Sequence, residues 1–81
     1  MTQQSLRGEL KEMIAQLLEV DDFSDDDHFV RDMRADSMLL EELIVAIEMR
    51  YQCKFPDEEM RNLHCLKDVV RVVARILHVS S

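Results

Sequence analysis

Apolar residues recur with helical spacing in three stretches of the chain. The first runs from Ser5 to Glu19, and Thr2 or Ser5 could cap its start. The second runs from Ser37 to Tyr51, where Asp36 or Ser37 suits the capping position, and the third covers about 66–77. The three apolar stripes are Leu6, Leu10, Met13, Ile14, Leu17 and Leu18, then Leu40, Leu43, Ile44, Ile47 and Tyr51, then Leu66, Val69, Val70, Val73, Ile76 and Leu77.

Two segments between these stretches lack the period. Val20 to Asp36 is rich in Asp and predicts a long loop, and we expect some of its large apolar residues to pin it to the core. Those residues are Phe23, Phe29, Val30 and Met33. Gln52 to Pro56 breaks the second helix, and Pro56 suits the first turn of a short helix from Asp57 to Asn62. The tail from His78 is expected to fray. The pattern predicts an all-α fold, a small antiparallel bundle of three to four helices with a long loop after the first. One domain spans 1–81, with its core at about 5–77.

Composition narrows the possible functions. With 81 residues, one Gly and one Pro, the chain suits a small helical domain whose modest core leaves little room for an active site. A net charge of −7 disfavours nucleic acid and favours partners with basic surfaces. Apolar runs are too short for membrane insertion, and the start lacks the features of a signal peptide, so we expect a cytoplasmic protein. Cys53 and Cys65 do not form a disulfide framework.

One serine stands where the helical pattern resumes. Ser37 follows Asp36 directly, and taken alone it could simply cap the helix. A hydroxyl at a helix start is also exposed and held in a defined direction. The helix N-terminus tolerates an added phosphate there.

The residues around Ser37 resemble a known family. The run Phe29-Val30-Arg31-Asp32-Met33-Arg34-Ala35-Asp36-Ser37-Met38 is similar to the F-x-x-D-L-G-A-D-S-L pattern of acyl carrier proteins. The family's later E-L and A-[LI]-E segments match Glu42-Leu43 and Ala46-Ile47-Glu48, and its closing aromatic matches Tyr51. Its I-P-D-E-E segment matches Phe55-Pro56-Asp57-Glu58-Glu59. The order and spacing of these matches are more specific than the D-S pair alone.

The resemblance implies a monomeric carrier that performs no catalysis itself. Ser37 would hold a covalent 4′-phosphopantetheine arm, with Asp36 and Met38 as its motif neighbours, and acyl groups would travel on the arm as thioesters. The partners would be a phosphopantetheinyl transferase and acyl-loading and synthase enzymes with basic docking surfaces. We expect partner contacts at Leu39, Glu42, Val45, Glu48 and Met49, which flank or oppose the inward stripe. We expect an acyl-chain cavity lined by Leu43, Ala46, Ile47, Met60, Leu63 and Leu66.

Some positions depart from the family pattern. The usual glycine before A-D-S is Arg34, which adds charge beside the attachment serine and restricts the backbone unless its φ is negative. Leu39 replaces a common acid, Glu41 replaces a common hydrophobic residue, and Met49 and Arg50 stand where acids are frequent. These changes favour a specialised carrier over a housekeeping one.

Other functions compete with that of a carrier. A hydrolase built on Ser37, His28 and Asp36 lacks the G-x-S-x-G elbow and an oxyanion loop. The acids of 21–27 lack the glycine and closing Glu of a calcium loop, and the Cys and His residues lack zinc spacing, so no metal site is expected. An unmodified interaction module of the same fold and a peptidyl carrier stay open. Fatty acid, polyketide and related lipid or secondary-metabolite pathways all use such a scaffold.

Overall fold

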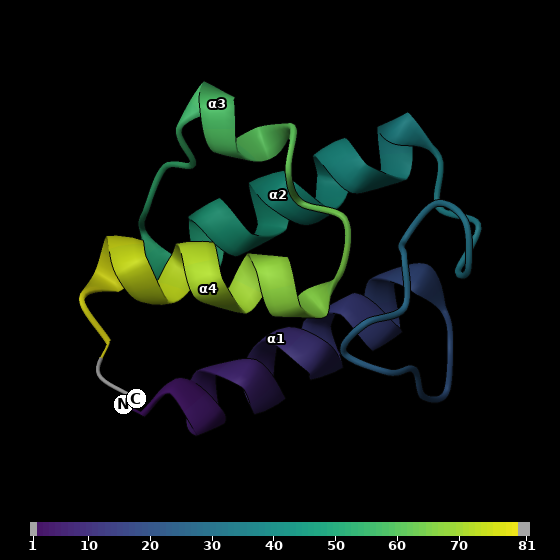
Figure 1. The fold of residues 1–81 in the computed structure, drawn as a ribbon, viewed down its shortest axis with the longest axis horizontal. Helices are drawn as coiled ribbons and strands as arrows, with labels where there is room; N and C mark the ends of the chain where they lie inside the picture. Colours follow the sequence, from purple (N-terminus) through teal and green to yellow (C-terminus); the bar gives the residue numbers. More distant parts are fainter. Residues whose placement is uncertain (1, 80–81) are drawn as a thin grey trace.

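In the part of the chain that the structure describes, four α-helices form the bundle that the pattern predicts. The computed structural model describes residues 2–79 of the chain. Its helices are α1 (Gln3–Leu18), α2 (Ser37–Tyr51), α3 (Asp57–Met60) and α4 (Leu66–Leu77), and no strand occurs within the described residues. Helix α1 packs against both α4 and α2 and runs antiparallel to them (Figure 1). The start of α1 and the end of α4 therefore lie at one end of the bundle, and the start of α2 lies at the other (Figure 1).

The helix boundaries follow from capping. Helix α1 begins two residues earlier than expected because the Thr2 hydroxyl accepts a hydrogen bond from the Ser5 backbone N–H, at 3.1 Å. The short α3 ends at Met60, two residues before the predicted Asn62, and Pro56 is its N-cap and not a member of its first turn. Helix α4 ends at Leu77 and is followed by His78 as a left-handed C-cap, and the last two residues of the predicted tail lie outside the described part.

The core is centred on α4, which is buried over more than one face. The predicted residues Leu66, Val69, Val70 and Val73 are buried, as expected. Helix α4 also buries Val72 and Ala74, which the single-stripe prediction left out. Ile76 and Leu77, in the last turn, are only half-buried and pack against the edge of the core. A helix covered on several sides needs apolar residues around more of its circumference than one stripe supplies.

A hydrogen bond joins the end of α2 to α1. The Tyr51 hydroxyl donates to Oε1 of Glu9 at 2.9 Å. Burial of the phenol and its bond to this carboxylate raise the pKa of Tyr51 to about 12, so Tyr51 keeps its proton and remains a donor at neutral pH.

The long loop between α1 and α2 is held by apolar anchors. Phe23 and Phe29 are buried, Met33 packs partly against the core, and Val30 points outward, so three of the four predicted anchors touch the core. The Phe29 N–H donates to the His64 carbonyl at 2.8 Å, and the His28 and His64 rings stack at 5.2 Å. These contacts fasten the loop to the segment between α3 and α4.

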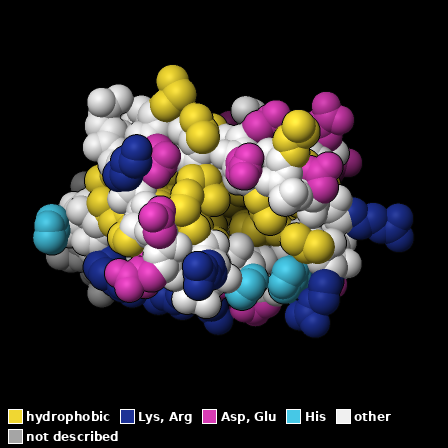
Figure 2. Space-filling model, turned by 90° about the horizontal axis from the view of Figure 1, so that it is seen from above, with side chains coloured by type: hydrophobic (Ala, Val, Ile, Leu, Met, Phe, Trp, Pro, Cys, Tyr) yellow, Lys and Arg dark blue, Asp and Glu magenta, His cyan; other side chains and the backbone are white. Residues whose placement is uncertain are grey.

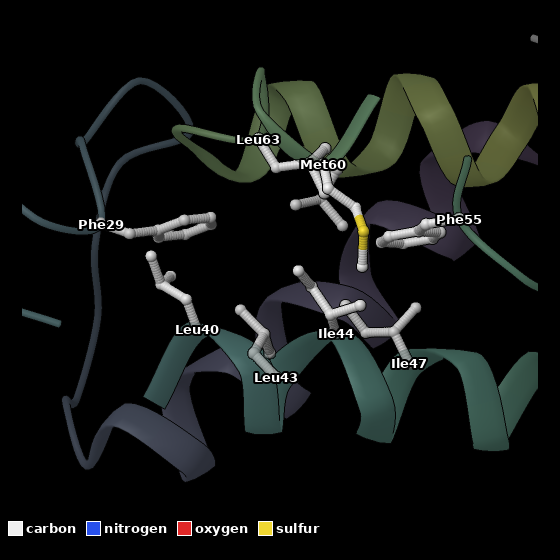
Figure 3. Close-up of a pocket in the computed structure, with 9 residues that line it drawn as sticks. Phe29, Leu40, Leu43, Ile44, Ile47, Phe55, Met60 and Leu63 are labelled. Carbon is white, nitrogen blue, oxygen red and sulfur yellow. The ribbon is translucent and has the colours of Figure 1, made fainter. Parts of the chain in front are cut away.

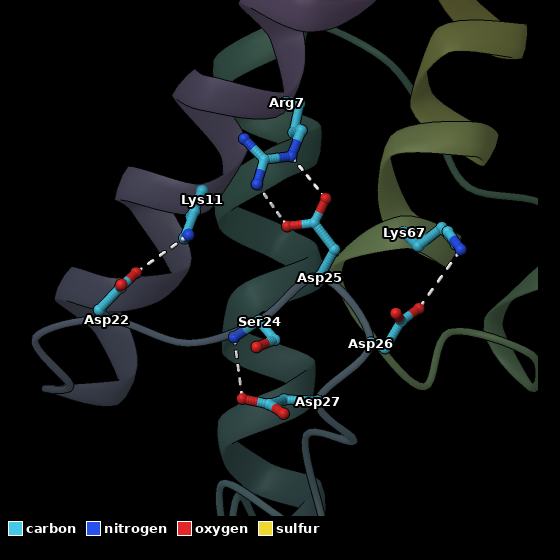
Figure 4. A network of polar contacts seen from close by, with 8 residues as sticks. All are labelled: Arg7, Lys11, Asp22, Ser24, Asp25, Asp26, Asp27 and Lys67. Atoms are coloured by element: carbon cyan, nitrogen blue, oxygen red, sulfur yellow. Dashed lines mark hydrogen bonds and ion pairs between the residues drawn. The ribbon is translucent and has the colours of Figure 1, made fainter.

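Acidic side chains of the same loop make ion pairs with the helices. Asp25 receives two hydrogen bonds from the Arg7 guanidinium of α1, and Asp22 pairs with Lys11 at 2.9 Å (Figure 4). Asp26 approaches Lys67 of α4 at 3.4 Å. The predicted acidic loop is therefore tied to α1 and α4 by several of its own carboxylates. Within residues 2–79, no helix is both long and apolar enough to cross a membrane.

Candidate phosphopantetheine attachment site

Ser37 is the first residue of α2, and its side chain faces solvent. The Asp36 carboxylate caps the helix by accepting a hydrogen bond from the Leu39 N–H at 2.8 Å. Within the described residues, the N–H groups of Ser37 and Met38 have no hydrogen-bond partner. Asp36 therefore performs the capping that could have been assigned to Ser37, which leaves the Ser37 hydroxyl free.

The segment before Ser37 fixes where α2 begins. Ala35 is buried, and its N–H donates to the Phe29 carbonyl at 2.8 Å. Arg34 has a φ of 60°, in the left-handed region. The φ of Arg34 is therefore positive, so the replacement of the usual glycine by arginine does restrict the backbone here. Glycine would adopt this conformation without strain, and arginine does not.

Replacing Arg34 by glycine should therefore raise the free energy of unfolding. Relief of the left-handed strain, about 1–2 kcal/mol, outweighs the greater entropy of an unfolded chain with glycine, and a net gain of about 0.5–1 kcal/mol is expected. Urea denaturation measures this gain. Arg31→Gly is the matched control, because Arg31 is also exposed and its φ is not positive. A gain in the control equal to that of Arg34→Gly would show that strain at Arg34 is not the cause.

The outer face of α2 combines apolar and acidic side chains. Met38 and Met49 are each 70% exposed and Val45 is 51% exposed. Together with Glu41 and Glu42 they line a shallow groove along the helix. Three exposed apolar side chains in one row are typical of a protein-contact surface.

Two of the residues predicted for partner contact have intramolecular roles. Leu39 is half-buried and packs against the core. Glu48 is also half-buried, and its Oε2 accepts a hydrogen bond from the Phe55 N–H at 2.8 Å. Glu42, Val45 and Met49 are exposed as the docking prediction requires. Of the five residues predicted for partner contact, three are therefore fully exposed and two are half-buried.

An apolar cavity lies between α2 and the α3 region. Seen from above, the centre of the molecule is hollowed, and hydrophobic side chains line the hollow (Figure 2). The cavity has a volume of about 60 Å³. Its nine lining residues are all apolar, and they are Phe29, Leu40, Leu43, Ile44, Ile47, Phe55, Met60, Leu63 and Val69. Phe29 and Phe55 stand at its two ends, with α2 side chains between them (Figure 3).

The structure brings together four of the six residues predicted for an acyl cavity. Leu43, Ile47, Met60 and Leu63 line the cavity, and the other two lie elsewhere. Ala46 faces shallow surface grooves on α2, one position away from the inward stripe. Leu66 is fully buried at the start of α4 but is not on the cavity wall.

Sequence reasoning missed the five other wall residues. Leu40 and Ile44 belonged to the predicted inward stripe of α2, and Val69 to that of α4, so helical periodicity could have identified them. Phe29 and Phe55 come from irregular segments, where no period shows the direction of a side chain. The available signal was their size and their place as the first residues of the two matched motif segments.

The arrangement fits a phosphate-linked arm with an apolar cargo. Free N–H groups at the start of α2 can donate to phosphate oxygens, and the helix dipole favours negative charge there. The cavity wall begins at Leu40, one turn along α2 from Ser37. The exposed Ser37 hydroxyl and an apolar cavity are thus placed along the same helix.

Comparisons with known proteins point the same way. A family model described as "Phosphopantetheine attachment site" matches residues 8–79. An acyl carrier protein of Brachyspira hyodysenteriae is 35% identical over 72 residues, which cover 85% of this chain and 92% of the relative. One from Wolinella succinogenes is 33% identical over 67 residues, covering 80% and 88%, and one from Rickettsia massiliae is 31% identical over 74 residues, covering 89% and 86%. This chain therefore belongs to the acyl carrier protein family and contains its phosphopantetheine attachment domain.

Proposed function

We propose that the chain carries acyl groups on a phosphopantetheine arm attached to the hydroxyl of Ser37. The observation that supports this most directly is the exposed, uncommitted Ser37 hydroxyl at the start of α2, with Asp36 as the cap in its place. Carriers of this family do no chemistry of their own, so the reactions on the cargo belong to partner enzymes.

Loading requires the Ser37 oxygen to displace part of coenzyme A. The Ser37 oxygen attacks the phosphorus that bears the pantetheine arm, the diphosphate bond breaks, and adenosine bisphosphate leaves. The hydroxyl proton passes to a base on the transferase, while the Asp36 carboxylate stays engaged as the cap of α2 by the Leu39 N–H. When bound, the arm supplies a terminal thiol that holds the acyl group as a thioester. The free N–H groups of Ser37 and Met38 would hold the phosphate at the helix start.

Intact mass spectrometry tests the attachment. Incubated with coenzyme A and a promiscuous phosphopantetheinyl transferase, the wild type should gain the mass of one arm and Ser37→Ala should gain nothing. Ser5→Ala, which alters another exposed serine near a helix start, should be loaded like the wild type. Modification of Ser37→Ala, or a lasting lack of modification of the wild type with several transferases, would contradict the proposal and favour an unmodified interaction module.

We further propose that partners of the carrier dock on the outer face of α2. Basic grooves on acyl-loading and synthase enzymes would meet Glu41 and Glu42, while Met38, Val45 and Met49 would supply apolar contact. The pathway is fatty acid, polyketide or related lipid or secondary-metabolite synthesis. The apolar row supports a specialised carrier, because a partner must cover it.

Adding an acid to this face should improve use by a generic bacterial fatty acid synthase. Met49→Glu should raise turnover by such enzymes about two- to fivefold over the wild type, because one added exposed ion pair contributes about 0.4–1 kcal/mol. Gln4→Glu adds the same charge on α1 and should leave turnover unchanged. The measurement is steady-state turnover with holo carriers. A wild type that already matches a housekeeping carrier would contradict the specialised reading.

A further inference from the structure

The cavity beside α2 has an entrance side and a far end. Ser37 opens α2, and the wall residues that follow along the helix run from Leu40 to Ile47. At a rise of 1.5 Å per residue these seven steps span about 10 Å. Phe29 lies by Leu40, and Phe55 lies by Ile47 (Figure 3). A chain tethered at Ser37 would therefore pass Leu40 first and meet Phe55 last.

The far end is firmly held. Phe55 is 3% exposed, and its N–H donates to Oε2 of Glu48 at 2.8 Å. Glu48 makes a second contact with this segment, because its backbone carbonyl accepts a hydrogen bond from the Cys53 N–H at 3.1 Å. Pro56 follows directly, with its ring-fixed φ of −63°. The Phe55 backbone is therefore held in place beside α2, and its ring is buried on the cavity wall.

The side wall is softer than the far end. Met60 ends the single-turn helix α3 and is partly exposed, and its side chain reaches toward Phe55 over the cavity (Figure 3). Methionine adapts to irregular gaps because it is unbranched and flexible. The cavity can therefore widen near Met60, while its length is limited by Phe55.

The cavity is small for an acyl site. An apolar cavity of about 150 Å³ holds benzene, with its six carbon atoms. The cavity here, at about 60 Å³, is less than half that size. By this comparison the resting cavity takes about two or three carbon atoms, and a few more when Met60 moves.

We propose that Phe55 limits the length of acyl chain that this carrier shelters, so that chains near butanoyl in length are enclosed and chains of octanoyl length or more are not. This inference rests on the proposed function. It makes Phe55 a specificity-determining residue of the carrier and assigns short acyl groups as its sheltered cargo.

The test uses carriers loaded at Ser37 with pantetheine analogues that bear butanoyl, octanoyl or dodecanoyl groups in a non-hydrolysable amide link. Intact mass first shows that each protein holds its arm. In the wild type, the melting temperature should rise by about 4 °C with butanoyl over the arm alone and should rise no further with octanoyl. In Phe55→Val, the rise should continue to octanoyl. Through-space NMR contacts between the octanoyl terminal methyl and Ile47 should appear in the variant and not in the wild type.

Two further variants keep the test decisive. Phe55→Leu retains more bulk, serves if the valine variant is unfolded, and should show the same continued rise with a smaller amplitude. Phe23→Leu removes an aromatic ring from a buried site outside the cavity and should keep the wild-type length profile. If the wild type gains stability up to dodecanoyl, or if its octanoyl methyl contacts Ile47, the inference is wrong and the carrier function stands. If mass spectrometry finds no arm on any protein, both fail together.

Discussion

Replacing Phe29 with alanine should lower the free energy of unfolding by about 3–5 kcal/mol, since the ring is 1% exposed and its loss leaves a hole in the core. For a domain of this size the total is about 4–12 kcal/mol, so much of the protein should unfold at moderate temperature. The loop before α2 is expected to detach first, because the Phe29 backbone bonds both Ala35 and His64. Urea denaturation and amide hydrogen exchange measure the two effects.

The adjacent residue provides the control for this experiment. Val30 is 47% exposed, and Val30→Ala should change the free energy of unfolding by less than about 0.5 kcal/mol. Equal losses in the two variants would mean that the loop is sensitive to any truncation and that the Phe29 ring is not its anchor.

Asp25→Asn should cost about 1–2 kcal/mol of stability at neutral pH, and the cost should vanish in acid. Hydrogen bonds from Arg7 hold the pKa of Asp25 below its usual range. A carboxylate whose pKa is lower in the folded state stabilises the fold above the unfolded value, about 3.9, and loses that contribution as the pH falls through the folded value. This loss in the free energy of unfolding lies between the value of a surface ion pair and that of a buried charged hydrogen bond, because the Asp25 side chain is 32% exposed.

The comparison needs urea denaturation of the wild type and the variant from pH 7 down to pH 3. Asp26→Asn is the matched control, because Asp26 is 79% exposed and meets Lys67 at 3.4 Å. Its loss should change stability by less than about 0.5 kcal/mol at any pH in the range. A difference between wild type and Asp25→Asn that stays constant down to pH 3 would exclude the Arg7 pair as its source.

Helical periodicity was sufficient to predict the main elements of the fold. Helices α2 and α4 have the predicted bounds, because Asp36 at one start and the break after Tyr51 are local signals of chain direction and capping. The inward stripe of α2 also supplied much of the cavity wall, since a 3.6-residue period states which side chains share a face.

Helical periodicity could not predict features that depend on irregular backbone. The left-handed φ of Arg34, the bond from Phe55 to Glu48 and the placement of both cavity-end phenylalanines arise from tertiary contacts of loops. No period assigns a side chain to a face in such segments. The helical period predicted an outward Glu48 but not the hydrogen bond that its carboxylate accepts from the Phe55 N–H, because Phe55 lies in a loop.

The start of α1 and the end of α4 lie at the same end of the bundle, opposite the start of α2 (Figure 1). A tag, a solid support or a neighbouring domain joined through either terminus would be on the far side from Ser37. Tethering the carrier in this way would leave the proposed attachment site at Ser37 unobstructed. The same geometry allows two tethers at once, so the carrier can be inserted as a module between other proteins without interposing bulk in front of the serine.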